Sequence, residues 1–252
     1  MTRSHPTRTA LVLALCLELG AGALRAPTVV AQPRGESEQT QAVTAETVAA
    51  RVQAFYDQTT TVQANFQQHF WNRAYARTQS SHGTVSIQRP GRIRFDYSQP
   101  RGKVVVSTPE GFVYFEPGED GSPGQYTRGS SEGASVALGF LTGTARLDRD
   151  FRLALLPARA GAPAHTDVLE LTPRVADPHF RRVLLYVDQR PATAGVVQRV
   201  SIEDHDGNWN RFDFARPRFN AELPASTFQF NPPAGAREMT APAATPPARG
   251  RG

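Results

Sequence analysis

The sequence has only one cysteine, Cys16, and no hydrophobic run long enough to cross a membrane. Because Cys16 lies near the start of the chain, nearly all of the sequence is without thiols and disulfides, and burial of apolar side chains must stabilise its fold. The apolar run from Ala10 to Leu17 is much shorter than the roughly 20 residues of a membrane-spanning helix. These absences exclude thiol chemistry, a disulfide framework and a stable helical membrane anchor.

Residues 1–31 are typical of a secretory signal peptide. Arg3 and Arg8 precede the apolar run, and small residues follow it up to Ala23 and again up to Ala31. Cleavage after residue 23 and cleavage after residue 31 both fit this pattern. We therefore expect an exported protein.

The net charge of +5 comes mostly from the two ends of the chain. Residues 1–31 carry three arginines against one glutamate, and residues 236–252 carry the same balance, so that each end contributes +2 and +1 remains for the body. Nucleic-acid binding depends largely on neutralising phosphates. The near-neutral body therefore argues against a nucleic acid as partner.

The hydrophobic pattern divides the chain into a short linker, one domain and a tail. We expect residues 32–43 to be flexible, residues 44–236 to form a single domain, and residues 237–252, rich in Pro, Ala and Arg, to be disordered. The domain opens with a helix near residues 44–59, for which Thr44 is the predicted N-cap.

From Thr61 the apolar residues alternate with polar ones, which is typical of strands. A possible strand lies at 125–128, and the alternation stops after it. The residues that follow predict a short helix at 134–141, which lies between two groups of predicted strands. Asp206-Gly207 predicts a tight hairpin turn. The remaining predicted strands begin at about 62, 85, 93, 104, 112, 151, 168, 183, 196, 210 and 227.

These elements predict a mainly β protein with a few helices, of the α+β class. An antiparallel sheet with so many strands tends to curl, so we expect an incomplete barrel. The apolar helix between the two groups of strands is a natural lid for an apolar cavity inside it.

One enzymatic pattern is present, Gly129-Ser130-Ser131-Glu132-Gly133, which matches the G-x-S-x-G motif of serine hydrolases. That motif needs a buried parallel strand before the serine, and the residues before Gly129 are half polar. A secreted hydrolase using Ser131 is therefore the remote alternative, and we expect no enzyme.

The six histidines are scattered without the spacing of a zinc site. The acidic run from Glu203 to Asn208 lacks the ligand spacing of a calcium loop and contains the predicted hairpin turn. We expect neither a metal nor a cofactor.

Several short segments resemble the outer-membrane lipoprotein carrier (LolA) family, over about residues 44–236. In order along the chain they are Phe66-Gln-Gln, Gly83-Thr-Val-Ser-Ile-Gln-Arg-Pro90, Ile93-Arg-Phe-Asp-Tyr-Ser-Gln-Pro100, Val104-Val-Val, Tyr114-Phe-Glu-Pro117, Leu171-Thr-Pro173 and Phe228-Gln-Phe-Asn-Pro-Pro233.

The resemblance implies a curved incomplete barrel closed by a helical lid. It also implies a monomeric periplasmic carrier that takes acylated lipoproteins from an inner-membrane ABC transporter and passes them to an outer-membrane receptor lipoprotein. Arg89 matches the family arginine that keeps the lid closed, and Ile93 matches a cavity residue that is aromatic in the family. We therefore expect Arg89 to act as a latch. The residues expected to line the cavity are Phe66, Val85, Ile87, Ile93, Phe95, Tyr97, Val136, Phe140 and Leu141.

A second possibility stays open from the sequence. The same cavity suits a carrier or sensor of another lipid or glycolipid, and the sequence does not record the cargo.

Overall fold

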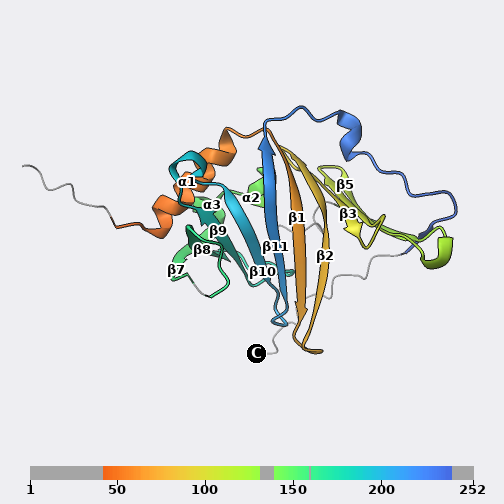
Figure 1. The fold of residues 1–252 in the computed structure, drawn as a ribbon, viewed down its shortest axis with the longest axis horizontal. Helices are drawn as coiled ribbons and strands as arrows, with labels where there is room; N and C mark the ends of the chain where they lie inside the picture. The colour runs from red at the N-terminus through yellow and green to blue at the C-terminus, as the bar shows by residue number, and fades with distance from the viewer. Residues whose placement is uncertain (1–41, 131–138, 159, 240–252) are drawn as a thin grey trace, which may run out of the picture. The chain divides into compact units, whose positions relative to one another are not determined.

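A computed structural model of the protein describes residues 42–130, 139–158 and 160–239. The predicted signal peptide, Ser131, Val136 and residues 240–252 lie outside these ranges. Within them, twelve strands form one sheet that does not close into a barrel (Figure 1). The mainly β architecture and the open, incomplete barrel agree with the fold class expected from the sequence.

The predicted first helix is α1, which spans Ala45–Asp57. Thr44 caps it as expected, because its side chain accepts a hydrogen bond from the Thr47 N–H (3.2 Å) while the Thr47 hydroxyl side chain accepts one from the Thr44 N–H (3.0 Å). The apolar residues recur on one face of the helix, and this face packs on the sheet. Its buried residues are Ala45, Val48, Ala49, Val52 and Tyr56.

The sheet consists of two series of consecutive antiparallel strands. The first series is β1 (Thr61–Asn72), β2 (Arg77–Gln88), β3 (Arg92–Gln99), β4 (Val104–Thr108), β5 (Gly111–Glu116) and β6 (Gln125–Gly129). The second is β7 (Phe151–Leu156), β8 (Thr166–Pro173), β9 (Arg182–Asp188), β10 (Val197–Glu203) and β11 (Trp209–Phe219). The loops of the described ranges contain short 3₁₀ helices at Glu119–Gly121, Pro191–Thr193 and Ala225–Phe228.

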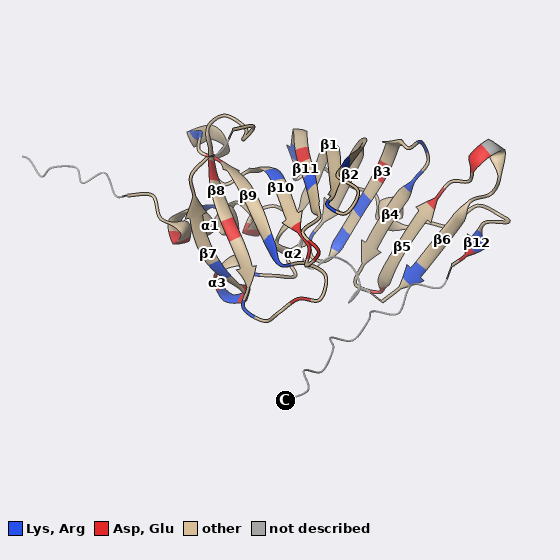
Figure 2. Cartoon of the chain, turned by 90° about the horizontal axis from the view of Figure 1, so that it is seen from below, with Lys and Arg blue, Asp and Glu red and all other residues tan. Residues whose placement is uncertain are grey.

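The two series join where β1 pairs with β11, so that the first and last long strands are neighbours at the centre of the sheet. In Figure 2 the strands follow one another from β7 to β12 (Arg237–Glu238), and these two edge strands do not meet. The described part of the connection from β6 to β7 contains the short helices α2 (Gly139–Thr142) and α3 (Leu147–Asp150). The curved sheet thus has one face toward α1 and α2, which we call the inner face, and an opposite outer face.

Two expectations about the end of the chain are corrected. The predicted strand at Thr227–Phe230 is instead the end of a 3₁₀ helix, in which the Thr227 N–H donates to Pro224 O (2.9 Å). This segment crosses the outer face of β3 and β4, where the Arg94 side chain donates to its carbonyls in place of a partner strand.

The expected start of the disordered tail at residue 237 also differs from the structure. Arg237 and Glu238 form β12 and pair in parallel with β6, and the Met239 N–H donates to Tyr126 O (2.7 Å). The ordered part therefore extends at least to residue 239.

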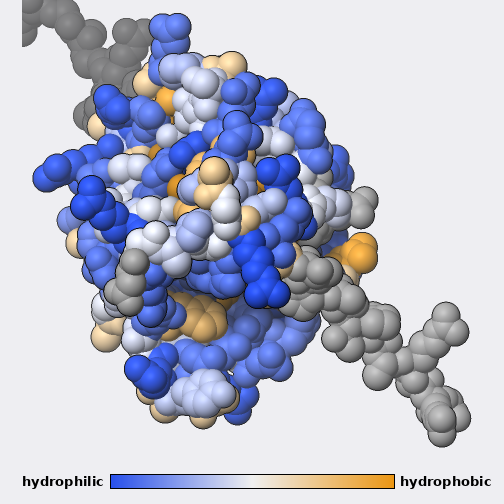
Figure 3. Space-filling view, turned by 90° about the vertical axis from the view of Figure 1, so that its right-hand side faces the viewer, coloured by the Kyte–Doolittle hydropathy of each residue, from blue (hydrophilic) through white to orange (hydrophobic). Residues whose placement is uncertain are grey.

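The apolar side chains form one large core on the inner face and a small one on the outer face of β4 to β6. The small cluster contains Val104, Val106 and Phe115, and Phe230 from the C-terminal segment covers it. Seen from the side of β3 and β5, the surface is mainly hydrophilic, with hydrophobic residues visible mostly in recesses (Figure 3). Burial on the inner face is therefore the main stabilising contribution to this fold.

Gly83 in β2 is a position where the packing of two strands leaves no room for a side chain. An added Cβ there would lie 2.0 Å from Asp96 O on β3. We expect Gly83→Ala to lower the free energy of unfolding by about 1–3 kcal/mol, because β3 must move away. Urea denaturation measures this loss, and Gln79→Ala at an exposed position of the same strand is the control. Equal stability of the two variants would contradict the close approach of β2 and β3.

Candidate functional site

The residues predicted to line a cavity come together on the inner face of the sheet. All eight that fall within the described residues belong to one apolar cluster, and none is more than 8% exposed. They are Phe66 from β1, Val85 and Ile87 from β2, Ile93, Phe95 and Tyr97 from β3, and Phe140 and Leu141 from α2. The ninth, Val136, lies outside the described residues.

An aromatic group forms the middle of this cluster. Phe66 meets Phe95 and Tyr97 edge to face, with ring centroids 5.2 and 5.0 Å apart. Phe212 from β11 joins them at 5.5 Å from Phe95. Phe212 was missing from the predicted set, although its strand was expected, because only the pairing of β11 with β1 brings it beside Phe66.

The apolar side chains of the described residues pack closely on the inner face. The void between α1, α2 and strands β1, β2, β10 and β11 measures about 20 Å³, enough for about one water molecule. It lies between Tyr56, Leu141 and Val197, among others. The expected cavity residues therefore pack against one another, and an acyl chain enters only if the helices move away from the sheet.

Arg89 lies directly after β2 and extends toward the last turn of α1. Its Nη1 donates a hydrogen bond to the Tyr56 carbonyl, and its Nη2 lies 3.6 Å from Asp57 Oδ1. The side chain is only 13% exposed, and burial lowers the pKa of Arg89 while the Asp57 carboxylate raises it. A guanidinium at a helix C-terminus binds the free carbonyls there and interacts favourably with the helix dipole.

The same corner of the molecule also holds α2. An added Cβ at Gly143 would lie 2.7 Å from Arg89 Nε, so the guanidinium packs directly on the backbone after α2. Two residues further along, the Gly91 N–H donates to Thr142 O (2.8 Å). The turn between β2 and β3 thus contacts both helices that cover the inner face.

Tyr56 connects α1 to the sheet at a second point. Its buried hydroxyl lies 3.4 Å from the Val197 N–H, which donates to it, and burial raises the pKa of Tyr56 to about 12. Its ring also meets Phe140 edge to face (6.2 Å). Tyr56 is therefore a buried contact between both helices and β10.

The remaining motifs give no catalytic or metal site within the described residues. Gly129 ends β6, which pairs antiparallel with β5 and in parallel only with the two-residue β12, whereas a nucleophile elbow needs a buried strand of a parallel sheet, and Ser131 lies outside the described ranges. Asp204 forms the predicted turn by accepting from the Asn208 N–H (2.8 Å). In the described part of the chain, no three His, Cys, Asp or Glu side chains are placed to hold a metal ion. No helix described there has the length and apolar character to span a bilayer.

Comparisons with known proteins found a matching family model, similar sequences and similar solved structures. The model of the family described as "Outer membrane lipoprotein carrier protein LolA" matches residues 57–231. An outer-membrane lipoprotein carrier protein of Dechloromonas aromatica is 30% identical over 182 residues, which cover 72% of this chain and 82% of the relative. One from Methylibium petroleiphilum is 31% identical over 188 residues, covering 73% and 85%. A crystal structure of a LolA superfamily protein from Nitrosomonas europaea covers 75% of this chain and 99% of that one, at 16% identity and a TM-score of 0.43.

The filled interior has a measurable consequence at Phe140. We expect Phe140→Ala to lower the free energy of unfolding by about 3–5 kcal/mol, because α2 inserts this ring into a packed core. The control is Leu155→Ala at the exposed end of β7, with an expected effect within about 0.5 kcal/mol. Chemical denaturation compares the two. A loss at Phe140 as small as that at Leu155 would mean that the interior is open and hydrated.

Proposed function

This chain belongs to the LolA family of outer membrane lipoprotein carrier proteins, and from that premise we propose that it carries lipoproteins across the periplasm. Proteins of this family are carriers and not enzymes, and they are periplasmic. In the proposed cycle the chain receives an acylated lipoprotein from an inner-membrane ABC transporter and releases it to an outer-membrane receptor lipoprotein. The observation that carries the proposal is the apolar interior on the inner face of the sheet, covered by α1 and α2.

The energetics explain why such a carrier needs an apolar interior. Burying a CH₂ group gains about 0.8 kcal/mol, so exposing a chain of about 16 carbons to water costs about 12 kcal/mol. Crossing an aqueous compartment without protection is therefore very unfavourable. The inner face offers a continuous apolar surface from β1, β2 and β3 that can replace the membrane as the environment of the chains.

Loading requires a change of conformation. Because the void measures about 20 Å³, bound acyl chains must take the space that α1, α2 or their side chains occupy in the closed state. When the helices move away, the acyl chains take their place against the apolar side chains of the sheet. An equilibrium between a closed empty state and an open loaded state, separated by a few kcal/mol, suits a protein that must both load and unload.

Arg89 is the proposed latch of the closed state. Its contacts with Tyr56, Asp57 and the backbone at Gly143 join the end of β2 to both covering helices. A hydrogen bond from a charged donor contributes about 1.5–3 kcal/mol, which is in the range needed to bias such an equilibrium. In the loaded protein the guanidinium is displaced from the helices, and its return favours release.

The latch predicts a specific defect for Arg89→Leu. We expect the variant to fold and to load lipoprotein, but to release it more slowly or incompletely, because the closed state loses its polar contacts. Transfer of a labelled lipoprotein from the purified carrier to outer-membrane vesicles measures release. Arg92→Leu is the matched control, since the Arg92 side chain donates to the nearby Gln88 side chain (3.1 Å) and, within the described residues, has no hydrogen bond to α1 or α2. Normal release by Arg89→Leu would exclude the latch.

Native mass spectrometry of the protein purified from its own periplasm tests the cargo. We expect co-purified acylated lipoproteins, most clearly with Arg89→Leu, because that variant retains what it loads. Lipid extraction of the same sample identifies any free lipid. A free lipid or glycolipid without lipoprotein would overturn the proposed cargo and leave the apolar interior as the carrier site of another lipid.

A further inference from the structure

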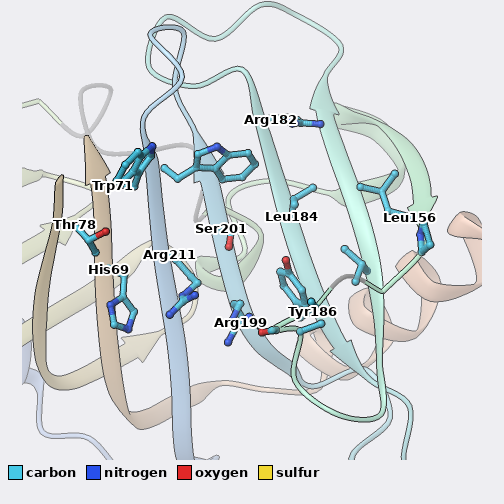
Figure 4. Close-up of a pocket in the computed structure, with 16 residues that line it drawn as sticks. His69, Trp71, Thr78, Leu156, Arg182, Leu184, Tyr186, Arg199, Ser201 and Arg211 are labelled. Carbon is cyan, nitrogen blue, oxygen red and sulfur yellow. Dashed lines mark hydrogen bonds between the residues drawn. The ribbon is translucent and has the colours of Figure 1, made fainter. Parts of the chain in front are cut away.

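A groove of about 680 Å³ lies on the outer face of the sheet, on the opposite side from the apolar interior. Its volume is within the range of small-molecule sites. The side chains that line it come from alternate positions of β1, β9, β10 and β11, from one residue each of β2, β7 and β8, and from the loop after β7. In Figure 4 His69, Arg211 and Arg199 lie in a row across three neighbouring strands. Nothing in the proposed carrier function uses this groove.

The charged residues that line the groove are all basic. Arg182, Arg199 and Arg211 line it together with His69, and no carboxylate is among its lining residues. The carboxylates nearby form ion pairs with these arginines: Glu170 and Glu203 with Arg182, and Asp213 with both Arg199 and Arg211. Because Arg181 also pairs with Glu203, four arginines face three carboxylates and one positive charge is left over.

Among the three arginines that line the groove, Arg211 makes the fewest hydrogen bonds to the described residues. Its Nε is buried and lies 2.9 Å from Asp213 Oδ2 in an ion pair, so the donors that a ligand in the groove could reach are those of its two Nη atoms. Arg199 already donates to Asp213 and, through Nη1, to Gly161 O (2.6 Å). A planar guanidinium with free donors beside a second one fits a carboxylate or phosphate, which both arginines can bind together.

An aromatic surface adjoins these arginines. Trp71 on β1 and Trp209 on β11 are directly paired across the strands, so both indoles lie on the outer face. Arg182 lies over the Trp209 ring at 5.3 Å, whereas Trp71 is 37% exposed. Tyr186 is covered in the same way by Arg199 (5.1 Å). The Trp71 indole is thus a partly exposed flat surface at one end of the groove.

We propose that the outer groove binds a small anionic ligand, whose phosphate or carboxylate group lies between Arg199 and Arg211 and whose ring lies against Trp71. The ligand class is a ring compound such as a sugar that bears one of these groups, either free or as the headgroup of a lipid. The site is independent of the apolar interior, because the sheet separates the two.

The chain provides its own probe of this site. Its two tryptophans, Trp71 and Trp209, both line the groove, so intrinsic tryptophan fluorescence reports on the groove. Titration with inositol 1-phosphate and with glucuronate tests the two anionic groups, and neutral myo-inositol tests the ring alone. We expect a saturable change with at least one of the anions, and at least about tenfold weaker binding of myo-inositol.

Two variants on β11 distinguish binding in the groove from a general effect of removing a positive charge. Arg211→Gln is expected to weaken anion binding about tenfold or more. Arg218→Gln is the matched control, because Arg218 lies on the outer face of β11 as well, outside the groove, where it donates to Gln63 (2.7 Å). If Arg211→Gln does not fold, Arg211→Lys keeps the charge without the planar fork and is expected to bind more weakly than the wild type.

Co-sedimentation with lipid vesicles shows whether the ligand is a lipid headgroup or a soluble compound. Co-sedimentation with phosphatidylcholine vesicles that contain phosphatidylinositol, but not with phosphatidylcholine alone, would assign the site to a lipid headgroup. Binding of the free compounds without vesicle binding would assign it to a soluble ligand. The proposal is wrong if no anion changes the fluorescence at millimolar concentrations, or if Arg211→Gln binds as tightly as Arg218→Gln. Neither result affects the lipoprotein proposal, whose test is the cargo retained by Arg89→Leu.

Discussion

The packing of α1 and α2 on the inner face of the sheet is the contact on which the rest of this structure depends. The only cysteine lies in the predicted signal peptide, so apolar burial must hold the helices in place. In the proposed carrier, the side chains of β1 and β2 that Tyr56 of α1 and Leu141 of α2 cover include ones that an acyl chain would contact. In the proposed cycle the closed state and the loaded state would therefore compete for one apolar surface, and the stability of the empty protein would set how strongly a cargo must bind to open it.

Polar contacts at the turn between β2 and β3 fix the position of the two helices on the sheet. The turn between β2 and β3 reaches α1 through Arg89 and α2 through Gly91 and the backbone at Gly143. Apolar contacts alone are non-directional and would let the helices settle in many positions. A buried guanidinium with a defined carbonyl partner fixes one position, and it also gives the closed state a contact that a cargo cannot replace with CH₂ groups.

The two faces of the sheet have different chemistry because successive side chains point in opposite directions along each strand. In β9, Val183, Leu185 and Val187 enter the core, whereas Arg182 and Tyr186 line the outer groove. One set of strands thus builds an apolar interior and a basic, aromatic groove back to back. The central pairing of β1 with β11 completes both, since it places Phe66 near Phe212 on one face and Trp71 beside Trp209 on the other.

The sequence by itself determined the first helix, most of the strands and the sides of those strands, because these follow from local periodicity and capping. The start of α1 at Thr44, the turn at Asp206-Gly207 and the apolar residues of β1 to β3 were all predicted from neighbouring residues. The 3₁₀ turn at Thr227 was not, because its alternation resembles a strand, and only the tertiary structure shows that its carbonyls bind the Arg94 side chain instead of a strand. The pairing of β1 with β11 joins residues about 150 positions apart, such as Phe66 and Phe214, and no local pattern encodes it. The filled interior, the reach of Arg89 to Tyr56 and the outer groove all follow from that long-range arrangement, so only the tertiary structure decided them.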